Sequence, residues 1–178
     1  MPISVKRKYV YAATATLVSL AVVAYLSRKK IYQYFDYKTK VLLLTLDPGF
    51  RKKVEKFLEK ARKEGIELRV TSAHRTCEEQ NELYAQGRTK PGDIVTNAVC
   101  GKSAHNYRRS VDVVEFKNGK PIWENSRWEL IGKLGESVGL EWGGRWKSFK
   151  DRPHFQDLGG KTVAQLFLEY QRTGKLAA

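Results

Sequence analysis

The stretch SAHNYRRSVDVVEF, residues 103–116, combines a histidine and an aspartate with a strand pattern. His105 and Asp112 stand seven positions apart, and the run from Val111 to Phe116 is largely apolar and rich in β-branched residues. Asn118-Gly119 follows, a dipeptide that favours a two-residue hairpin turn. The stretch therefore predicts a central buried strand with the Asp112 carboxylate at its entrance.

His105 and Asp112 are candidates for two of the three protein ligands of a catalytic zinc. Zinc accepts neutral imidazole nitrogen and carboxylate oxygen, and a catalytic site leaves its fourth position to water. His154 supplies a second imidazole in the segment DRPHF, where Pro153 stiffens the backbone. Asp151 lies three residues before His154 and suits a general base for metal-assisted hydrolysis. The same ligand set also holds iron or manganese, so the donors alone leave the metal open.

Helix and strand signals continue along the chain from Asp47 onward. Asp47-Pro48 has the form of an N-cap followed by proline at the first helical position, and apolar residues recur at helical spacing up to Gly65. The other expected elements are a strand at 66–71, a helix at 78–86, a return strand at 121–123, a helix at 128–138 and a terminal helix at 163–170. This succession predicts one mixed domain with a single core.

The amino-terminal segment 9–26 is an uncharged run of eighteen residues with basic triplets on both sides. It is long enough to cross a bilayer, longer than the apolar core of a signal peptide, and lacks a good cleavage site. Its alanine and threonine content makes insertion marginal. The sequence therefore predicts a membrane anchor and basic linker over residues 1–40, and a catalytic domain over residues 41–178.

The chain is strongly basic, with 33 Lys and Arg against 19 Asp and Glu and a net charge of +14. Such a charge favours a polyanionic partner, which includes teichoic acid, anionic lipid headgroups, acidic stem peptides and nucleic acid. No recognised nucleic-acid motif accompanies the charge, so specific nucleic-acid binding is not expected.

Five short motifs, separated along the chain, resemble motifs of one known protein family and occur in the same order. These are SAHRT at 72–76, EQN at 79–81, LYAQGRTKPG at 83–92, VTNA at 95–98 and EWGGRWKSFKDRPHF at 141–155. Over roughly residues 42 to 158 the chain resembles the zinc D,D-carboxypeptidase and L-alanyl-D-glutamate endopeptidase family of bacterial cell-wall enzymes, the VanY-like peptidases. The last motif resembles the phage endolysin branch of that family.

The resemblance implies an α+β fold of the hedgehog and D,D-peptidase type, in which helices flank a small antiparallel sheet, preceded here by one amino-terminal transmembrane helix. It implies one zinc ion per chain on His105, Asp112 and His154. Asp151 then activates water, and Arg75 binds the scissile carbonyl and stabilises the oxyanion. The substrate-binding residues that it implies are Ser103, Gln80 and Tyr107.

The function implied by the resemblance is hydrolysis of the peptidoglycan stem peptide between L-alanine and D-glutamate. A D-alanyl-D-alanine carboxypeptidase is the alternative within the family. A catalytically impaired, zinc-containing cell-wall binding module is the alternative of another class, because Arg108 stands where the family has glycine. We expect a monomer in the bacterial inner membrane, with its domain facing the periplasm or cell wall. The marginal anchor resembles those of signal-arrest-release endolysins, and the sequence leaves later release and a permanent anchor as alternatives.

The two cysteines, Cys77 and Cys100, lie on either side of the expected cleft. In an oxidising periplasm they can form a disulfide, and as free buried thiols they would be structural. Their spacing does not match the close pairs of structural zinc sites. The sequence leaves the disulfide and the free thiols as alternatives.

Overall fold

Residues Lys38–Ala178 form one compact unit, separate from the unit Met1–Tyr37. The computed structural model describes residues 23, 26 and 36–176 of the chain. The membrane segment expected at 9–26 lies outside these residues, apart from Val23 and Leu26. Within the described residues, no helix has the length and apolar character needed to span a bilayer.

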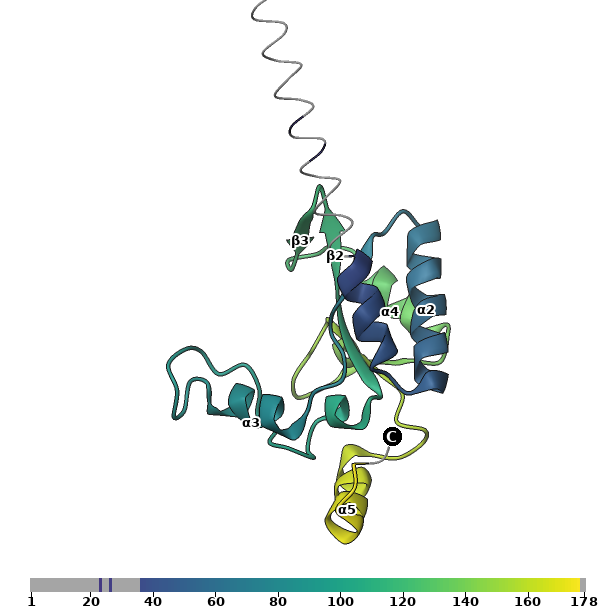
Figure 1. Cartoon of the computed structure of the whole chain (residues 1–178). Helices are drawn as coiled ribbons and strands as arrows, with labels where there is room; N and C mark the ends of the chain where they lie inside the picture. Colours follow the sequence, from purple (N-terminus) through teal and green to yellow (C-terminus); the bar gives the residue numbers. More distant parts are fainter. Residues whose placement is uncertain (1–22, 24–25, 27–35, 177–178) are drawn as a thin grey trace, which may run out of the picture. The chain divides into compact units, whose positions relative to one another are not determined.

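Helices and a small antiparallel sheet make up the larger unit (Figure 1). After the helical residues 38–44, the elements are α2 (Pro48–Lys63), β1 (Leu68–Ser72), α3 (Cys77–Ala85), the 3₁₀ helix η1 (Ala104–Tyr107), β2 (Ser110–Lys117), β3 (Lys120–Ile122), α4 (Trp128–Glu136), β4 (Glu141–Trp142), the 3₁₀ helix η2 (Gly143–Arg145), β5 (His154–Gln156) and α5 (Val163–Thr173). The sheet has the order β1-β2-β5-β4, with β3 also paired to β2. All of its pairings are antiparallel, which confirms the expected α+β class.

Helix α2 forms where the cap signals predicted it. The Asp47 side chain accepts a hydrogen bond from the Phe50 N–H at 2.9 Å, and Pro48 occupies the first turn. The buried side chains of α2 are Phe50, Val54, Phe57 and Ala61, which recur every three or four residues. This stripe packs into the main core beneath the sheet.

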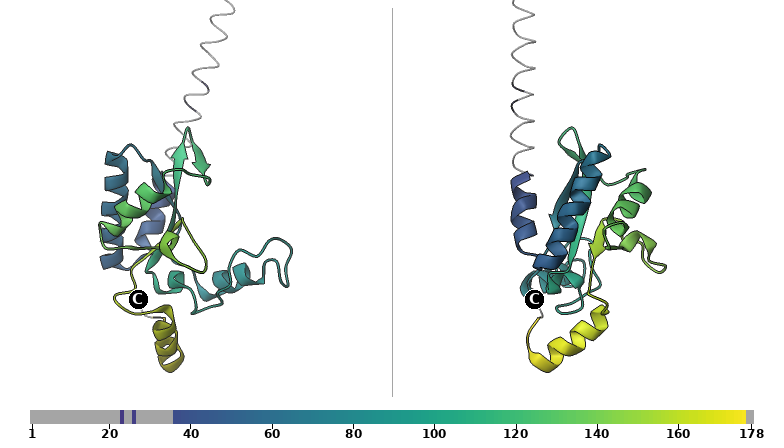
Figure 2. Two further views of the ribbon diagram at one scale, coloured as in Figure 1. Left: turned by 180° about the vertical axis from the view of Figure 1, so that it is seen from behind. Right: turned by 90° about the vertical axis from the view of Figure 1, so that its right-hand side faces the viewer.

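The sheet has one face for the core and one for polar side chains. Side chains alternate between the faces of a strand. Val111 and Val113 of β2 and Phe155 of β5 belong to the core cluster, so Asp112 and His154 point to the opposite face. Helical residues 38–44, α2 and α4 lie side by side against the core face (Figure 2). The face that carries Asp112 and His154 is therefore left open to ligands.

Two parts of the fold were not expected from the pattern. Strands β4 and β5 contain two and three residues, too few for a visible alternation. Helical residues also run through the expected domain boundary at residue 41. Thr39 is buried and its hydroxyl accepts a hydrogen bond from the Val70 N–H at 3.3 Å, which ties this helix to β1.

Replacing Arg108 by glycine is expected to stabilise the fold. Arg108 follows η1 in the left-handed region, with φ 59° and ψ 22°. That region costs an L-residue about 1–2 kcal/mol, whereas glycine loses about 0.5–1 kcal/mol more conformational entropy on folding. The free energy of unfolding of Arg108→Gly, measured in urea, should rise by about 0.5–1 kcal/mol.

Arg109→Gly is the matched control, because Arg109 has no positive φ and its guanidinium donates to the Asp157 carbonyl at 3.3 Å. This variant should be less stable than the parent. Equal destabilisation by the two substitutions would contradict strain at Arg108.

Candidate active site

Three potential metal ligands meet on the open face of the sheet. His105 lies on η1, while Asp112 on β2 and His154 on β5 are direct cross-strand partners. Asp112 Oδ1 lies 3.3 Å from His105 Nε2 and 3.1 Å from His154 Nδ1. One donor atom from each residue lies within 4.8 Å of the other two. Two imidazoles and one carboxylate at this spacing fit the three-ligand set of a catalytic zinc.

The electrostatics of this cluster favour a positive charge beside Asp112. Burial raises the pKa of the Asp112 carboxyl, but the two imidazoles outweigh burial and hold that pKa well below its usual range. Burial lowers the pKa of His154, but the adjacent Asp112 outweighs it and leaves that pKa above its usual value. A divalent cation supplies the favoured positive charge while both imidazoles stay neutral.

Arg75, between β1 and α3, reaches the same carboxylate. Its Nη2 donates to Asp112 Oδ2 at 2.9 Å, its Nε donates to Ser72 Oγ at 3.1 Å, and its Nη1 donates to Gln80 Oε1 at 3.5 Å. These bonds use three of the five N–H donors of a guanidinium. The remaining two can face a ligand, because Arg75 lines the cleft.

Asp151 occupies the loop between η2 and β5 and lines the same cleft. Its backbone N–H donates to the Gly143 carbonyl at 3.1 Å, and its carbonyl accepts from the His154 N–H at 3.2 Å. Burial raises the pKa of the Asp151 carboxyl. A raised pKa makes a carboxylate a better acceptor for the proton of a reacting water.

The cleft around these groups has a volume of about 960 Å³ and an apolar rim. More than half of the surface of each rim side chain is exposed: Ile94, Val95, Trp123 and Phe149. They come from the loop after α3, the segment after β3 and the loop before β5. Exposed apolar side chains gathered around a cleft are typical of a binding groove for an extended ligand.

Two of the three expected substrate-binding residues lie away from the cleft surface. Gln80 and Tyr107 are almost completely buried and do not line the cleft. Gln80 Nε2 donates to the Ala98 carbonyl at 2.7 Å, and the Tyr107 hydroxyl donates to the Gly101 carbonyl at 2.7 Å. Both side chains therefore hold the loops that surround the site. Ser103 does line the cleft, and its Oγ accepts from the His105 N–H at 3.4 Å.

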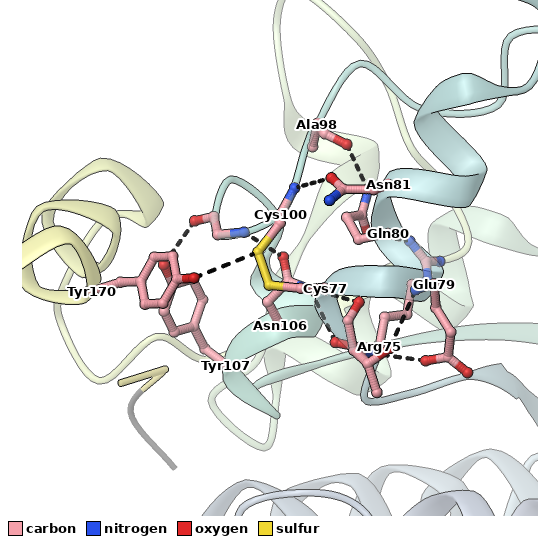
Figure 3. The surroundings of a disulfide bond; sticks show 12 residues. Arg75, Cys77, Glu79, Gln80, Asn81, Ala98, Cys100, Asn106, Tyr107 and Tyr170 are labelled. Atoms are coloured by element: carbon pink, nitrogen blue, oxygen red, sulfur yellow. Dashed lines mark hydrogen bonds between the residues drawn. A yellow bond between two sulfur atoms is a disulfide. The ribbon is translucent and has the colours of Figure 1, made fainter. Parts of the chain in front are cut away.

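Cys77 and Cys100 form a disulfide beside the cleft (Figure 3). Cys77 is the first residue of α3, and the Cys100 N–H donates to the Asn81 side-chain oxygen at 2.9 Å on the same helix. The next N–H, from Gly101, donates to the Asn106 side chain of η1 at 3.0 Å. The disulfide thus ties the start of α3 to the segment that leads into His105.

Removing this disulfide is expected to lower stability. The cross-link spans a sequence separation of 23 residues. In the chain-entropy model a loop of this length contributes about 3 kcal/mol. The double variant Cys77→Ser/Cys100→Ser should lose about 3 kcal/mol of unfolding free energy in urea. Reductant should lower the unfolding free energy of the parent to that of the double variant and leave the double variant unchanged. A parent whose unfolding free energy does not respond to reductant would contradict the prediction.

The fold and the site together define a metal-dependent hydrolase, and sequence comparison gives its family. Residues 96–157 match the family model described as D-alanyl-D-alanine carboxypeptidase. The chain is also 38% identical over 121 residues to the peptidoglycan L-alanyl-D-glutamate endopeptidase CwlK of Bacillus subtilis (strain 168), with 62% of this chain and 72% of that protein covered. The chain therefore belongs to the zinc D,D-carboxypeptidase and L-alanyl-D-glutamate endopeptidase family and is a metallopeptidase.

Solved structures share the fold. The Serratia marcescens L-Ala D-Glu endopeptidase ChiX matches with a TM-score of 0.55 and 24% identity, over 66% of this chain and 84% of that chain. The vancomycin resistance D,D-pentapeptidase VanY, solved in complex with Zn(II), matches with a TM-score of 0.50 and 16% identity, over 69% of this chain and 78% of that chain. At these identities the likeness concerns the fold.

Sequence reasoning missed Gln156, which lies directly beside a metal-ligand candidate. His154 Nε2 is 3.0 Å from Gln156 Oε1. The signal was present in the motif His154-Phe155-Gln156, because alternation on a strand places the first and third side chains on one face when the second is in the core. It was not visible without the knowledge that these residues form a strand.

Proposed function

We propose that this cleft hydrolyses the bond between L-alanine and D-glutamate in peptidoglycan stem peptides, with one zinc ion per chain on His105, Asp112 and His154. The observation that carries the proposal is the convergence of this ligand triad with Arg75 and Asp151 in one cleft. Bound zinc would act as a Lewis acid and lower the pKa of water in the cleft. The rest of the chemistry falls to the protein side chains.

Asp151 acts as the general base and then as the general acid. Its carboxylate takes a proton from the attacking water, and the same oxygen later delivers that proton to the leaving amine. The surroundings suit this exchange, because burial favours the protonated carboxyl while His154 and Arg75 favour the carboxylate. Burial outweighs these charges, so the pKa of the Asp151 carboxyl is raised from its usual value toward the working pH.

Arg75 stabilises the charge that develops on the carbonyl oxygen. Its guanidinium is fixed by Ser72 and Asp112, so little side-chain entropy is lost when the remaining N–H groups meet the substrate. Preorganised donors of this kind contribute to transition-state stabilisation because they need no reorientation.

The choice of bond rests on the curated relative CwlK and on the shape of the cleft. An endopeptidase must hold substrate on both sides of the scissile bond. The exposed apolar side chains of the cleft rim come from three separate segments, so they can contact substrate on both sides. The D-alanyl-D-alanine carboxypeptidase alternative is favoured by the description of the matching family model. Both activities would use the same triad, base and arginine.

Soluble disaccharide pentapeptide muropeptides distinguish the two activities. The full-length chain, loaded with zinc, should release a tetrapeptide that begins with a new amino group on D-glutamate, identified by mass spectrometry. Free D-alanine in its place would transfer the assignment to the carboxypeptidase. Intact muropeptide in the presence of bound zinc would favour the binding module without catalysis.

The proposal includes a membrane tether at residues 9–26, with the catalytic unit facing the periplasm or cell wall and with later, endolysin-like release. It is supported by the length of the uncharged segment and by the location of peptidoglycan outside the membrane. The undigested chain should sediment with membranes. In cells whose outer membrane has been removed but whose inner membrane is intact, added protease should digest the catalytic unit. Protection from protease would contradict the orientation.

A further inference from the structure

A continuous chain of side-chain hydrogen bonds ends on His154. The Trp146 indole Nε1 donates to Glu141 Oε1 at 2.7 Å, and Gln156 Nε2 donates to Glu141 Oε2 at 2.9 Å. Gln156 Oε1 in turn lies 3.0 Å from His154 Nε2. The sheet builds this arrangement, because Glu141 on β4 and Gln156 on β5 are direct cross-strand partners.

The donors and acceptors of this chain fix its direction. An indole N–H can only donate and a carboxylate can only accept. Glu141 therefore requires that Gln156 turn its NH₂ group toward β4, which leaves the amide carbonyl facing His154. A carbonyl only accepts, so His154 must carry a proton on Nε2. The orientation of a glutamine amide is ordinarily ambiguous, but here the carboxylate decides it.

We propose that Glu141, acting through Gln156, fixes His154 in the Nε2–H tautomer, so that the lone pair on Nδ1 is presented to the metal position. His154 Nδ1 lies 3.1 Å from Asp112 Oδ1, on the side of the ring opposite the chain. Glu141 and Gln156 are then positioning residues for a metal ligand. The inference rests on the proposed function for its metal, because without a cation the Asp112 carboxylate would also accept a proton from Nδ1.

The position of the proton on His105 is also determined by a hydrogen-bond acceptor, here a backbone carbonyl. His105 Nδ1 lies 2.5 Å from the Ala73 carbonyl, which can only accept, so that ring carries its proton on Nδ1 and presents Nε2 to Asp112 at 3.3 Å. The two rings thus offer opposite nitrogens to one metal position beside Asp112 Oδ1. The tautomer of His105 depends on the backbone, whereas the tautomer of His154 depends on two replaceable side chains.

Burial protects the inner end of this hydrogen-bond chain from water. His154 is 6% exposed and Gln156 is 7% exposed, so bulk water does not readily replace their contact. Glu141 is exposed to solvent at the outer end of the hydrogen-bond chain. Its carboxylate determines which end of the Gln156 amide faces His154. Partners of metal-binding histidines typically change metal affinity by about 10–100-fold when they are replaced.

The isosteric variant Glu141→Gln tests the direction of the chain. Its new oxygen would accept from Trp146, and its NH₂ would face Gln156, which would turn its carbonyl outward and its NH₂ toward His154. His154 would then carry its proton on Nδ1, against the metal. Zinc affinity, measured by competition with a chromophoric chelator, should fall by about 10–100-fold.

The swapped variant Glu141→Gln/Gln156→Glu restores the original direction, because the new carboxylate at 156 accepts from His154 while the new amide at 141 donates to it and accepts from Trp146. Zinc affinity should return to within a few fold of the parent. Glu59→Gln is the control, since it makes the same chemical change in an exposed side chain that pairs with Lys63 on α2. It should leave zinc affinity unchanged.

Nitrogen NMR of the imidazoles in the zinc-loaded, full-length protein reads which ring nitrogen carries the proton and which binds the metal. His154 should carry its proton on Nε2 and bind zinc through Nδ1 in the parent and in the swapped variant. Parent-like zinc affinity in Glu141→Gln would overturn the inference, as would a loss of affinity that the swap does not restore. A parent that binds no zinc would overturn the metal of the proposed function instead.

Discussion

Asp151→Asn is expected to lower kcat on muropeptides by about 10²–10⁴-fold while zinc stays bound. Asparagine preserves the size of the side chain but cannot take the proton of the attacking water. Asp151 is not one of the three clustered metal ligands, and its backbone bonds to Gly143 and His154 do not involve the carboxylate. The loss should therefore appear in kcat, with zinc content and KM close to those of the parent.

The control for this variant is Asp93→Asn, which removes the same charge from an exposed loop residue that does not line the cleft. Its activity should equal that of the parent. Full activity of Asp151→Asn would remove Asp151 from the reaction, and loss of zinc from Asp151→Asn would make it a ligand.

His105→Ala is expected to abolish zinc binding, and activity should fall by more than about 100-fold, because even the outer partners of a metal ligand change affinity by about 10–100-fold. A readout independent of activity is the stabilisation of the fold by the metal. Zinc at 100 times its Kd should raise the unfolding free energy of the parent by about 2.7 kcal/mol, and should do nothing for His105→Ala.

His74→Ala is the control for this second variant, because the chain contains three histidines and His74 does not line the cleft. Burial lowers the pKa of His74, which agrees with a packing role beside the site. Zinc should stabilise His74→Ala as much as the parent. If both variants still respond to zinc, the metal is held elsewhere.

The sequence predicted those parts of the fold that depend on local signals. Asp47-Pro48 and the spacing of the apolar residues identified α2, and the run from Val111 with Asn118-Gly119 identified β2 and the turn to β3. Strands β4 and β5 could not be predicted in this way, because such short strands are stabilised by tertiary pairing and not by their own pattern.

In the candidate site, too, some residues could be identified from the sequence, whereas the roles of others depend on the fold. The structure brings to one cleft the residues that their chemistry and the family motifs identified: His105, Asp112, His154, Asp151 and Arg75. Gln80 and Tyr107 belong to the same motifs, but burial decides their role and burial is not visible in a motif. The pairing of Cys77 with Cys100 likewise required the fold, which brings their Cα atoms to 4.6 Å.

Metal-dependent cleavage of the stem peptide is tested most directly by zinc titration of the full-length chain on purified peptidoglycan. The protein is first stripped with a chelator, zinc is returned in steps, and new amino groups on D-glutamate are counted by mass spectrometry against bound zinc per chain. The account predicts no cleavage without metal and a rise in new ends up to one zinc per chain. Cleavage that persists after zinc removal, or intact peptidoglycan with one zinc bound, would contradict it.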